Sequence, residues 1–174
     1  MVIGSVRKGR TADAVARMVT NQLDDIGAEY EVADLKELDL PFVNQETIPG
    51  AANEQYEDER VRTWSKKVKA SDAFILVSAE YNHGPPASLK NAIDWLFGEW
   101  HNKPAAIVGY GGMGGTRAAA QLKLNILRVK LFPVAEIPIP KVKDYVKNGV
   151  VENEKAEENV RKAVKTLSEF SINT

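Results

Sequence analysis

The sequence alternates short apolar runs with amphipathic segments, and this alternation constrains the fold more than any other feature. Five runs have the length and composition of strands, and each is followed by a segment with apolar residues at helical spacing. The expected strands cover residues 1–4, 29–35, 72–79, 103–110 and 132–139, and the expected helices cover 11–26, 57–70, 85–98, 115–128 and 152–170. Such alternation predicts a three-layer α/β fold, in which a parallel sheet lies between helices.

Two of the expected strands carry information about the sheet. The run DAFILVSA, residues 72–79, is apolar almost throughout, which is typical of a parallel strand covered on both faces. The run 132–139 contains Pro133 and Pro138, which cannot donate to a ladder, so we expect an edge strand there. Because parallel strands end at the same edge of a sheet, the loops after the first, third and fourth strands are expected to form the functional site.

Length and composition limit the function. The 174 residues fit one domain, residues 1–174, and the net charge of −1 provides no basic field for nucleic acid. Cysteine is absent and there are two histidines, so thiolate catalysis is excluded and no metal site is expected. No apolar stretch approaches the roughly 20 residues that span a membrane, and the start lacks a secretion signal. We therefore expect a cytoplasmic protein without a membrane or nucleic-acid partner.

The first loop, GSVRKGRT (4–11), has features of a phosphate site. It offers glycines for tight turns, the hydroxyls of Ser5 and Thr11, and the positive charges of Arg7, Lys8 and Arg10. Thr11 is expected to cap the following helix, whose N-terminus would then favour an anion. The loop matches neither the P-loop pattern GxxxxGK[ST] nor GxGxxG. The alternative is a solvated basic turn.

The second loop opens the stretch EYNHGPPASLKNAIDWL (80–96). Pro85 and Pro86 suit the first turn of a helix, and Tyr81 offers a flat apolar ring with a polar tip. The alternative is that Asn82 and Gly84 only form a turn and that His83 is exposed. Farther on, Trp95 and Leu96 are expected in the core, and Lys90 with Asp94 as a surface pair.

The third loop, GYGGMGG (109–115), has five glycines in seven residues. Without Cβ atoms its backbone can approach a flat ligand closely and direct N–H groups toward it. It also leads into a helix N-terminus, which favours electron-rich atoms. The alternative is a flexible loop.

Together these three motifs resemble the NADPH-dependent FMN reductase family, the flavodoxin-like quinone, azo-dye and chromate reductases. The resemblance rests on GSVRKGR, EYNHGPPASLKNAIDWL and GYGGMGGTRAAAQLKLNIL in this order, and it is weakest in residues 36–56 and after residue 140. It implies a flavodoxin-like fold with a five-stranded parallel sheet in the order 2-1-3-4-5, and one FMN at the carboxyl ends of the strands.

The resemblance also implies roles for individual residues. Those expected to hold the FMN phosphate are Ser5, Arg7, Arg10 and Thr11. Those expected to line the ribityl chain and the isoalloxazine ring, partly through their backbone, are Glu80, Tyr81, Asn82 and His83. Those expected at the pyrimidine side of the ring are Tyr110, Gly111 and Gly112. The chain departs from the family at Ala79, where proline is common, at Gly109, where serine is common, and at the pair His83-Gly84.

The function implied by the resemblance is reduction of a small-molecule acceptor, such as a quinone, through bound FMN. NADPH (or NADH) would be the electron donor, and no catalytic side chain is expected because the cofactor carries the chemistry. The resemblance further suggests a homodimer or a dimer of dimers, with the helix from Pro85 and the 36–56 segment as candidate interface elements. Two alternatives are a flavodoxin-like electron carrier, which the net charge of −1 disfavours, and a non-enzymatic FMN-binding regulator.

Overall fold

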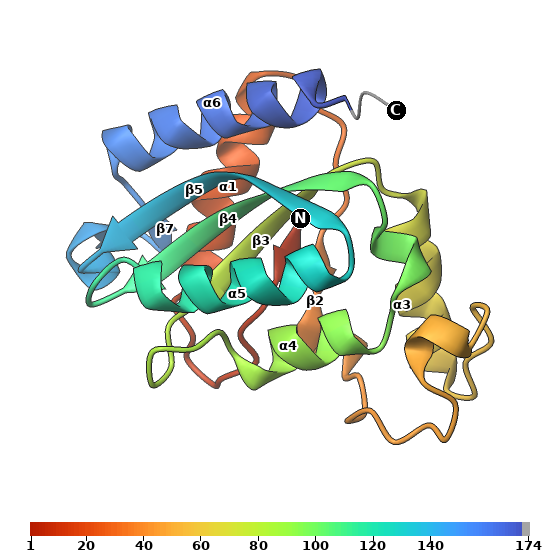
Figure 1. Cartoon of the computed structure of the whole chain (residues 1–174). Helices are drawn as coiled ribbons and strands as arrows, with labels where there is room; N and C mark the ends of the chain where they lie inside the picture. The colour runs from red at the N-terminus through yellow and green to blue at the C-terminus, as the bar shows by residue number, and fades with distance from the viewer. Residues whose placement is uncertain (172–174) are drawn as a thin grey trace.

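The computed structural model describes residues 1–171, which fold around a five-stranded parallel sheet (Figure 1). The strands lie in the order β2-β1-β3-β4-β5. Their bounds are β1 (Val2–Ile3), β2 (Ala33–Asp34), β3 (Phe74–Ala79), β4 (Lys103–Gly111) and β5 (Leu131–Pro140). The predicted α/β architecture and the implied strand order are confirmed.

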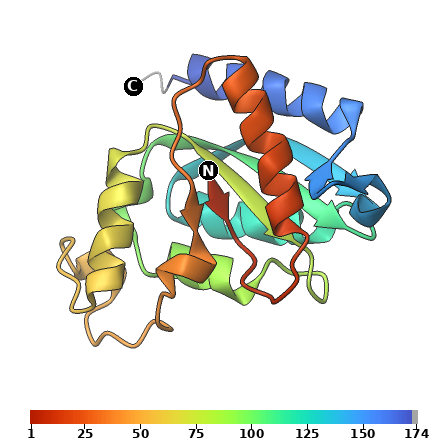
Figure 2. The ribbon, with the colours of Figure 1, turned by 180° about the vertical axis from the view of Figure 1, so that it is seen from behind.

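Helices cover both faces of the sheet, as the alternation predicted (Figures 1 and 2). One face carries α1 (Ala12–Asp25) and α6 (Glu154–Glu169). The other face carries α3 (Glu59–Ala70), α4 (Ala87–Asp94) and α5 (Thr116–Arg128). Each face has its own apolar core, because the side chains of β3 alternate between the two. The sheet is therefore buried on both sides, and ligands can reach it only at its edges.

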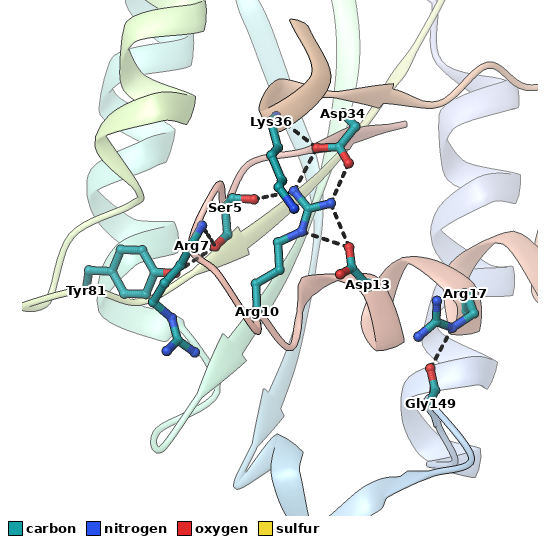
Figure 3. A network of polar contacts seen from close by, with 9 residues as sticks. All are labelled: Ser5, Arg7, Arg10, Asp13, Arg17, Asp34, Lys36, Tyr81 and Gly149. Atoms are coloured by element: carbon teal, nitrogen blue, oxygen red, sulfur yellow. Dashed lines mark hydrogen bonds and ion pairs between the residues drawn. The ribbon is translucent and has the colours of Figure 1, made fainter. Parts of the chain in front are cut away.

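Several short elements complete the fold. They are α2 (Leu35–Leu38), the 3-10 turns η1 (Pro49–Ala51), η2 (Gly98–Trp100) and η3 (Val142–Tyr145), and the antiparallel strands β6 (Val146–Lys147) and β7 (Val150–Val151). The hairpin of β6 and β7 turns at Asn148 and Gly149, whose φ angles are 48° and 78°. Arg17 Nε donates to the Gly149 carbonyl at 2.6 Å, which fastens the hairpin to α1 (Figure 3).

The two strands at one side of the sheet are shorter than the sequence predicted. The expected strand 29–35 forms a ladder only at Ala33–Asp34, because β1 pairs with it only through Val2 and Ile3. At the other side, β5 is the last strand of the sheet, so the predicted edge strand is confirmed. An edge strand tolerates proline because one row of its backbone groups needs no partner.

The helix predicted for 85–98 ends earlier, at Asp94. Trp95 and Leu96 are nonetheless buried, with 2% and 1% of their surface exposed, as predicted for core residues. Lys90 Nζ lies 2.5 Å from Asp94 Oδ2, which confirms the predicted surface pair.

The long 36–56 segment is held against the fourth helix and the turn that follows it. Asn91 Nδ2 and Trp95 Nε1 both donate to the carbonyl of Pro41, at 2.8 and 2.6 Å. At the far end of the segment, the Tyr56 hydroxyl donates to the buried carboxylate of Glu99 at 2.7 Å. These contacts give the segment a defined path across α4 and η2.

A cavity of about 950 Å3 lies at the amino-terminal edge of the strands. It borders Met1, Phe74 and Ile75, because β3 extends two residues beyond its pairing with β1. The three motif loops lie at the opposite edge. Within residues 1–171, none of the helices is long and apolar enough to cross a membrane.

Candidate functional site

The three loops singled out in the sequence meet at the carboxyl edge of the sheet. The first and second are joined by a hydrogen bond of 2.6 Å between Ser5 Oγ and the Tyr81 hydroxyl. The second and third are joined because the backbone N–H of Glu80 donates to the carbonyl of Tyr110 at 3.2 Å. In a sheet of this order, the strand order reverses between β1 and β3, where ligands of such folds bind.

The first loop leaves β1 through a glycine that the packing requires. A Cβ at Gly4 would lie 2.9 Å from the Val77 carbonyl oxygen and 3.0 Å from Leu89 Cδ2, so no larger residue fits without a shift. Ser88 Oγ donates to the carbonyl of Gly4 at 2.5 Å. The loop is thereby fixed beneath the N-terminus of α4.

Ser5 is fully buried under the phenol of Tyr81. Its exposed fraction is 0%, whereas that of Tyr81 is 39%. Figure 3 shows the hydroxyl of Tyr81 pointing to Ser5 Oγ. The Ser5 hydroxyl is therefore closed to a ligand in this arrangement.

The side chain of Arg10 is buried in an ionic network rather than open to a ligand (Figure 3). It pairs with both carboxylate oxygens of Asp34 at the end of β2, and its Nε donates to Asp13 Oδ1 at 2.7 Å. Its Nη1 also donates to the carbonyl of Ser5 at 2.6 Å. The guanidinium is 6% exposed and joins the first loop to β2 and α1.

The charges of this network stabilise one another. The hydrogen bond to Asp34 is the largest cause that raises the pKa of Arg10 above its usual value, against the opposing effect of burial. Burial alone would raise the pKa of Asp34, but hydrogen bonds from Arg10 and from the Lys36 backbone N–H outweigh it and lower that pKa. Both groups are therefore charged at neutral pH.

In the part of the chain that the structure describes, the side chains of Arg7 and Thr11 are not held by bonds of this kind. The Arg7 backbone N–H lies 3.5 Å from Ser5 Oγ, and within residues 1–171 its exposed guanidinium has no hydrogen bond or ion pair. Thr11 is the N-cap residue of α1, as predicted, but its side chain makes no capping bond. A free guanidinium and an uncapped helix N-terminus are the parts that an anion would use.

The second loop begins with a tight reversal of the chain. The N–H and carbonyl groups of Tyr81 and Gly84 bond reciprocally at 2.9 Å, and the two residues between them have left-handed φ angles, 49° for Asn82 and 67° for His83. Asn and His are among the non-glycine residues that adopt this region most readily. The His83 carbonyl accepts from Gln121 Nε2 at 3.0 Å, while its side chain is exposed.

Glu80 caps α5, a role that the sequence did not reveal. Its carboxylate accepts from the backbone N–H groups of Arg117 and Ala118, at 3.1 and 3.4 Å. The residue at the N-cap position of α5 is Gly115, which has no side chain to do so. The only signal in the sequence was an acid at the end of one strand and a helix, after the next strand, that begins at glycine.

The glycines of the third loop have two different roles. A Cβ at Gly115 would lie 2.6 Å from the Tyr110 nitrogen, and one at Gly109 would lie 2.7 Å from the Gly114 oxygen, so these glycines let the loop fold against its own strand. By contrast, a Cβ at Gly112 would meet nothing within 4 Å. Gly111 and Gly112 thus form the more open part of the loop.

Tyr110 is buried in the apolar core on the face of the sheet that carries α1 and α6, and its phenol lies near Ser5 of the first loop. It is 5% exposed, and burial is the largest cause that raises the pKa of its phenol well above the usual value. Among residues 1–171, no group of three or more acidic or histidine side chains could hold a metal ion.

The fold and the site define a class of protein: an α/β protein of the flavodoxin-like type, in which the loops after β1, β3 and β4 meet at the carboxyl edge of the sheet. Its sequence matches the family described as NADPH-dependent FMN reductase over residues 1–144. The chain belongs to this family.

Curated relatives and solved structures agree with this assignment. The NAD(P)H-dependent FMN reductase LOT6 of Saccharomyces cerevisiae is 38% identical over 88% of this chain and 90% of its own length. A quinone reductase of Pseudomonas putida is 31% identical over 70% of this chain and 66% of its own. The structure of FerB, a flavoenzyme NAD(P)H:(acceptor) oxidoreductase of Paracoccus denitrificans, superposes with a TM-score of 0.69 and 27% identity, over 95% of this chain and 92% of that one.

Proposed function

We propose that this chain is an FMN-dependent NAD(P)H oxidoreductase that reduces quinones or similar small-molecule acceptors by two-electron transfer. The observation that carries the proposal is the meeting of three motif loops at the point where the strand order reverses. Membership of the family and the names of the relatives support both the cofactor and the donor.

The groups at this edge of the sheet fit FMN. The phosphate would bind at the first loop, where Arg7 has a free guanidinium and α1 begins without a side-chain cap. The pyrimidine side of the ring would lie against Gly111 and Gly112, and a Cβ at Gly112 would meet nothing within 4 Å. The main chain of residues 80–83 would line the site between the phosphate end and the pyrimidine end of FMN. The ring of Tyr81 would lie on the exposed side of this stretch.

Ser5 and Arg10, two of the residues predicted to contact the phosphate, would not contact it directly in the present arrangement. Ser5 would reach the phosphate only after Tyr81 moves, because the phenol covers its hydroxyl. Arg10 would contribute its positive charge while it holds the loop in shape through Asp34 and the Ser5 carbonyl.

Bound FMN would supply the redox chemistry, which is hydride acceptance from NAD(P)H and two-electron transfer to the acceptor. The chain supplies orientation and electrostatics. Its open glycine backbone offers N–H groups near the ring, and no side chain is assigned as an acid or a base.

We also propose that the protein acts as a homodimer or a dimer of dimers. Phe42 and Ile48 in the 36–56 segment are 77% and 69% exposed, which is unusual for large apolar side chains and is consistent with an interface. Sedimentation at micromolar concentration tests this, and a monomer throughout would contradict it. The cytoplasmic location stays a prediction.

The test of the cofactor is direct. Purified protein is expected to be yellow and to release FMN on denaturation, and it should oxidise NAD(P)H when a quinone is present. Riboflavin and a panel of quinone, azo and nitroaromatic acceptors define the specificity. If the protein takes up no FMN on titration, the assignment of FMN as its cofactor is wrong. If the protein binds FMN but oxidises NAD(P)H with none of the acceptors, the result favours the alternative of a non-enzymatic FMN-binding regulator.

A further inference from the structure

Glu80 places a negative charge beside the loop assigned to the pyrimidine side of the flavin. Its side chain is 10% exposed, and its carboxylate lies at the N-terminus of α5, where it accepts from two backbone N–H groups. A Cβ at Gly111 would lie 3.6 Å from Glu80 Cβ, so the acid adjoins the open part of the glycine loop. Glu80 is therefore a charged neighbour of the proposed ring site.

This placement alters what α5 can offer to a ligand. A helix N-terminus carries a partial positive charge of about half an elementary charge, which would otherwise favour an anion at the glycine loop. The Glu80 carboxylate uses the first-turn N–H groups of Arg117 and Ala118, and its negative charge opposes that partial charge. Arg117 Nη1 lies 3.3 Å from the carboxylate and is the positive partner of this acid.

The charge of the bound flavin changes during turnover. Hydride transfer moves two electrons and one proton from NAD(P)H to the ring, so the donor becomes NAD(P)+ and the ring gains one negative charge. In the proposed orientation the gained charge would lie at the pyrimidine side, next to the glycine loop, where a nearby acid is unfavourable.

We propose that Glu80 is a positioning residue that weakens the binding of reduced FMN relative to oxidised FMN. This inference rests on the proposed function, since it assumes that FMN binds at the glycine loop. The carboxylate fixes α5 and the loop by capping the helix, and its charge keeps the bound reduced flavin a ready electron donor to the acceptor. Arg117 acts in the opposite direction, because it partly neutralises Glu80.

The variant Glu80→Gln separates the two effects of the carboxylate. Glutamine keeps an oxygen that can accept from the N–H groups of α5, but it removes the charge. The dissociation constants of oxidised FMN and of chemically reduced FMN are measured for each protein, and their ratio is compared. The ratio of the oxidised to the reduced constant is expected to rise about tenfold in Glu80→Gln. By thermodynamic linkage the midpoint potential of bound FMN should rise equally, by about 30 mV for a two-electron couple.

Two further variants complete the test. Glu29→Gln removes an exposed acid at the opposite edge of the sheet and should leave the ratio unchanged. Arg117→Gln removes the positive partner and should lower the ratio, which provides an independent measurement if Glu80→Gln does not fold. An unchanged ratio in Glu80→Gln or, failing that variant, in Arg117→Gln overturns the inference and leaves the proposed function intact. Failure of the wild-type protein to bind FMN would contradict the proposed function itself.

Discussion

The first loop (4–11) and the third loop (109–115) occupy equivalent places after parallel strands, but different forces hold them. Side chains fix the first loop: Arg10 joins it to Asp34 and Asp13. The backbone fixes the third loop: Gly109 and Gly115 contact each other's chain where no Cβ fits. Both loops leave a small open part, Arg7 in one and Gly112 in the other.

The difference shows that one loop can be held by ion pairs between side chains and another by close contacts of its backbone. A buried ion pair orients the first loop, for which we propose a compact, charged ligand group, whereas bare backbone shapes the third loop, for which we propose a flat ring. It follows that loss of charge should damage the first loop and that addition of a methyl group should damage the third. The predictions below test this contrast, from the largest effect to the smallest.

Gly115→Ala should have the largest effect. Its φ angle of 71° is unfavourable for alanine, and the added Cβ would lie 2.6 Å from the Tyr110 nitrogen and 2.9 Å from the Gly109 carbonyl carbon. The combined conformational and steric cost is expected to lower the free energy of unfolding by about 3 kcal/mol or more. Chemical denaturation measures this loss.

Gly112→Ala is the matched control, because its Cβ would meet open space. Its free energy of unfolding should stay within about 0.5 kcal/mol of the wild type, as for most surface changes. Equal destabilisation by both substitutions would show that the two glycines do not differ in role.

Asp34→Asn should have the next largest effect, and it acts on the first loop. It leaves the buried guanidinium of Arg10 with one carboxylate partner, Asp13, which is itself half exposed. Loss of a buried ion-pair partner should lower the free energy of unfolding by about 2 kcal/mol. Asp94→Asn breaks an exposed pair with Lys90 and should cost about 0.5 kcal/mol or less. A similar cost for both would contradict the structural role of Asp34.

The same carboxylate predicts how stability depends on pH. Folding lowers the pKa of Asp34 below its ordinary value of 3.8, so its contribution is complete above that value. The contribution is lost as pH falls through the lowered pKa of the folded state. In Asp34→Asn, the free energy of unfolding should therefore fall less steeply as the pH is lowered into the acid range. At neutral pH its dependence on pH should be the same as in the wild type. An unchanged acid limb would argue against a charged Asp34 in the network.

Most of the fold could be predicted because it follows from local patterns. The apolar run 72–79 and the edge prolines of 132–139 each indicated a strand and its place in the sheet. The hairpin of residues 146–151 was missed, although Asn148-Gly149 between two pairs of strand residues is a recognised turn signal. The pattern of each strand was too short to stand out from the flanking loop.

The internal structure of the site could not be predicted in the same way. The partner of Arg10 is 24 residues away, and the N–H groups that Glu80 caps are 37 and 38 residues away, so only the folded topology brings them together. The glycines of residues 109–115 were interpreted as open to a ligand, and part of that set serves the packing of the loop. Sequence patterns thus located the three loops, and the structure separates their scaffold from their open groups.

Arg7→Ala tests the open part of the first loop. Its guanidinium is free of protein partners within residues 1–171, so its removal should change the free energy of unfolding by no more than about 0.5 kcal/mol. The loss of charged hydrogen bonds to phosphate should weaken FMN binding about 10- to 30-fold. Riboflavin, which lacks the phosphate, should bind nearly as before, and fluorescence quenching measures both ligands.

Lys8→Ala is the control for Arg7, since it removes a neighbouring exposed charge from the same loop. It should weaken FMN binding less than Arg7→Ala does, through a general electrostatic effect that salt screens. Equal losses for FMN and riboflavin in Arg7→Ala would mean that the guanidinium does not contact the phosphate.

The smallest effect concerns the contact between Ser5 and Tyr81, which joins the first loop to the second. Ser5→Ala and Tyr81→Phe each remove one partner of a 2.6 Å hydrogen bond, and each should lower the free energy of unfolding by about 1 kcal/mol. The double variant should cost little more than either single one, because both delete the same bond. Strict additivity would show that the two hydroxyls act independently. If Ser5 reaches the phosphate only when Tyr81 moves, Tyr81→Phe should strengthen FMN binding relative to riboflavin, and this gain should disappear in the double variant.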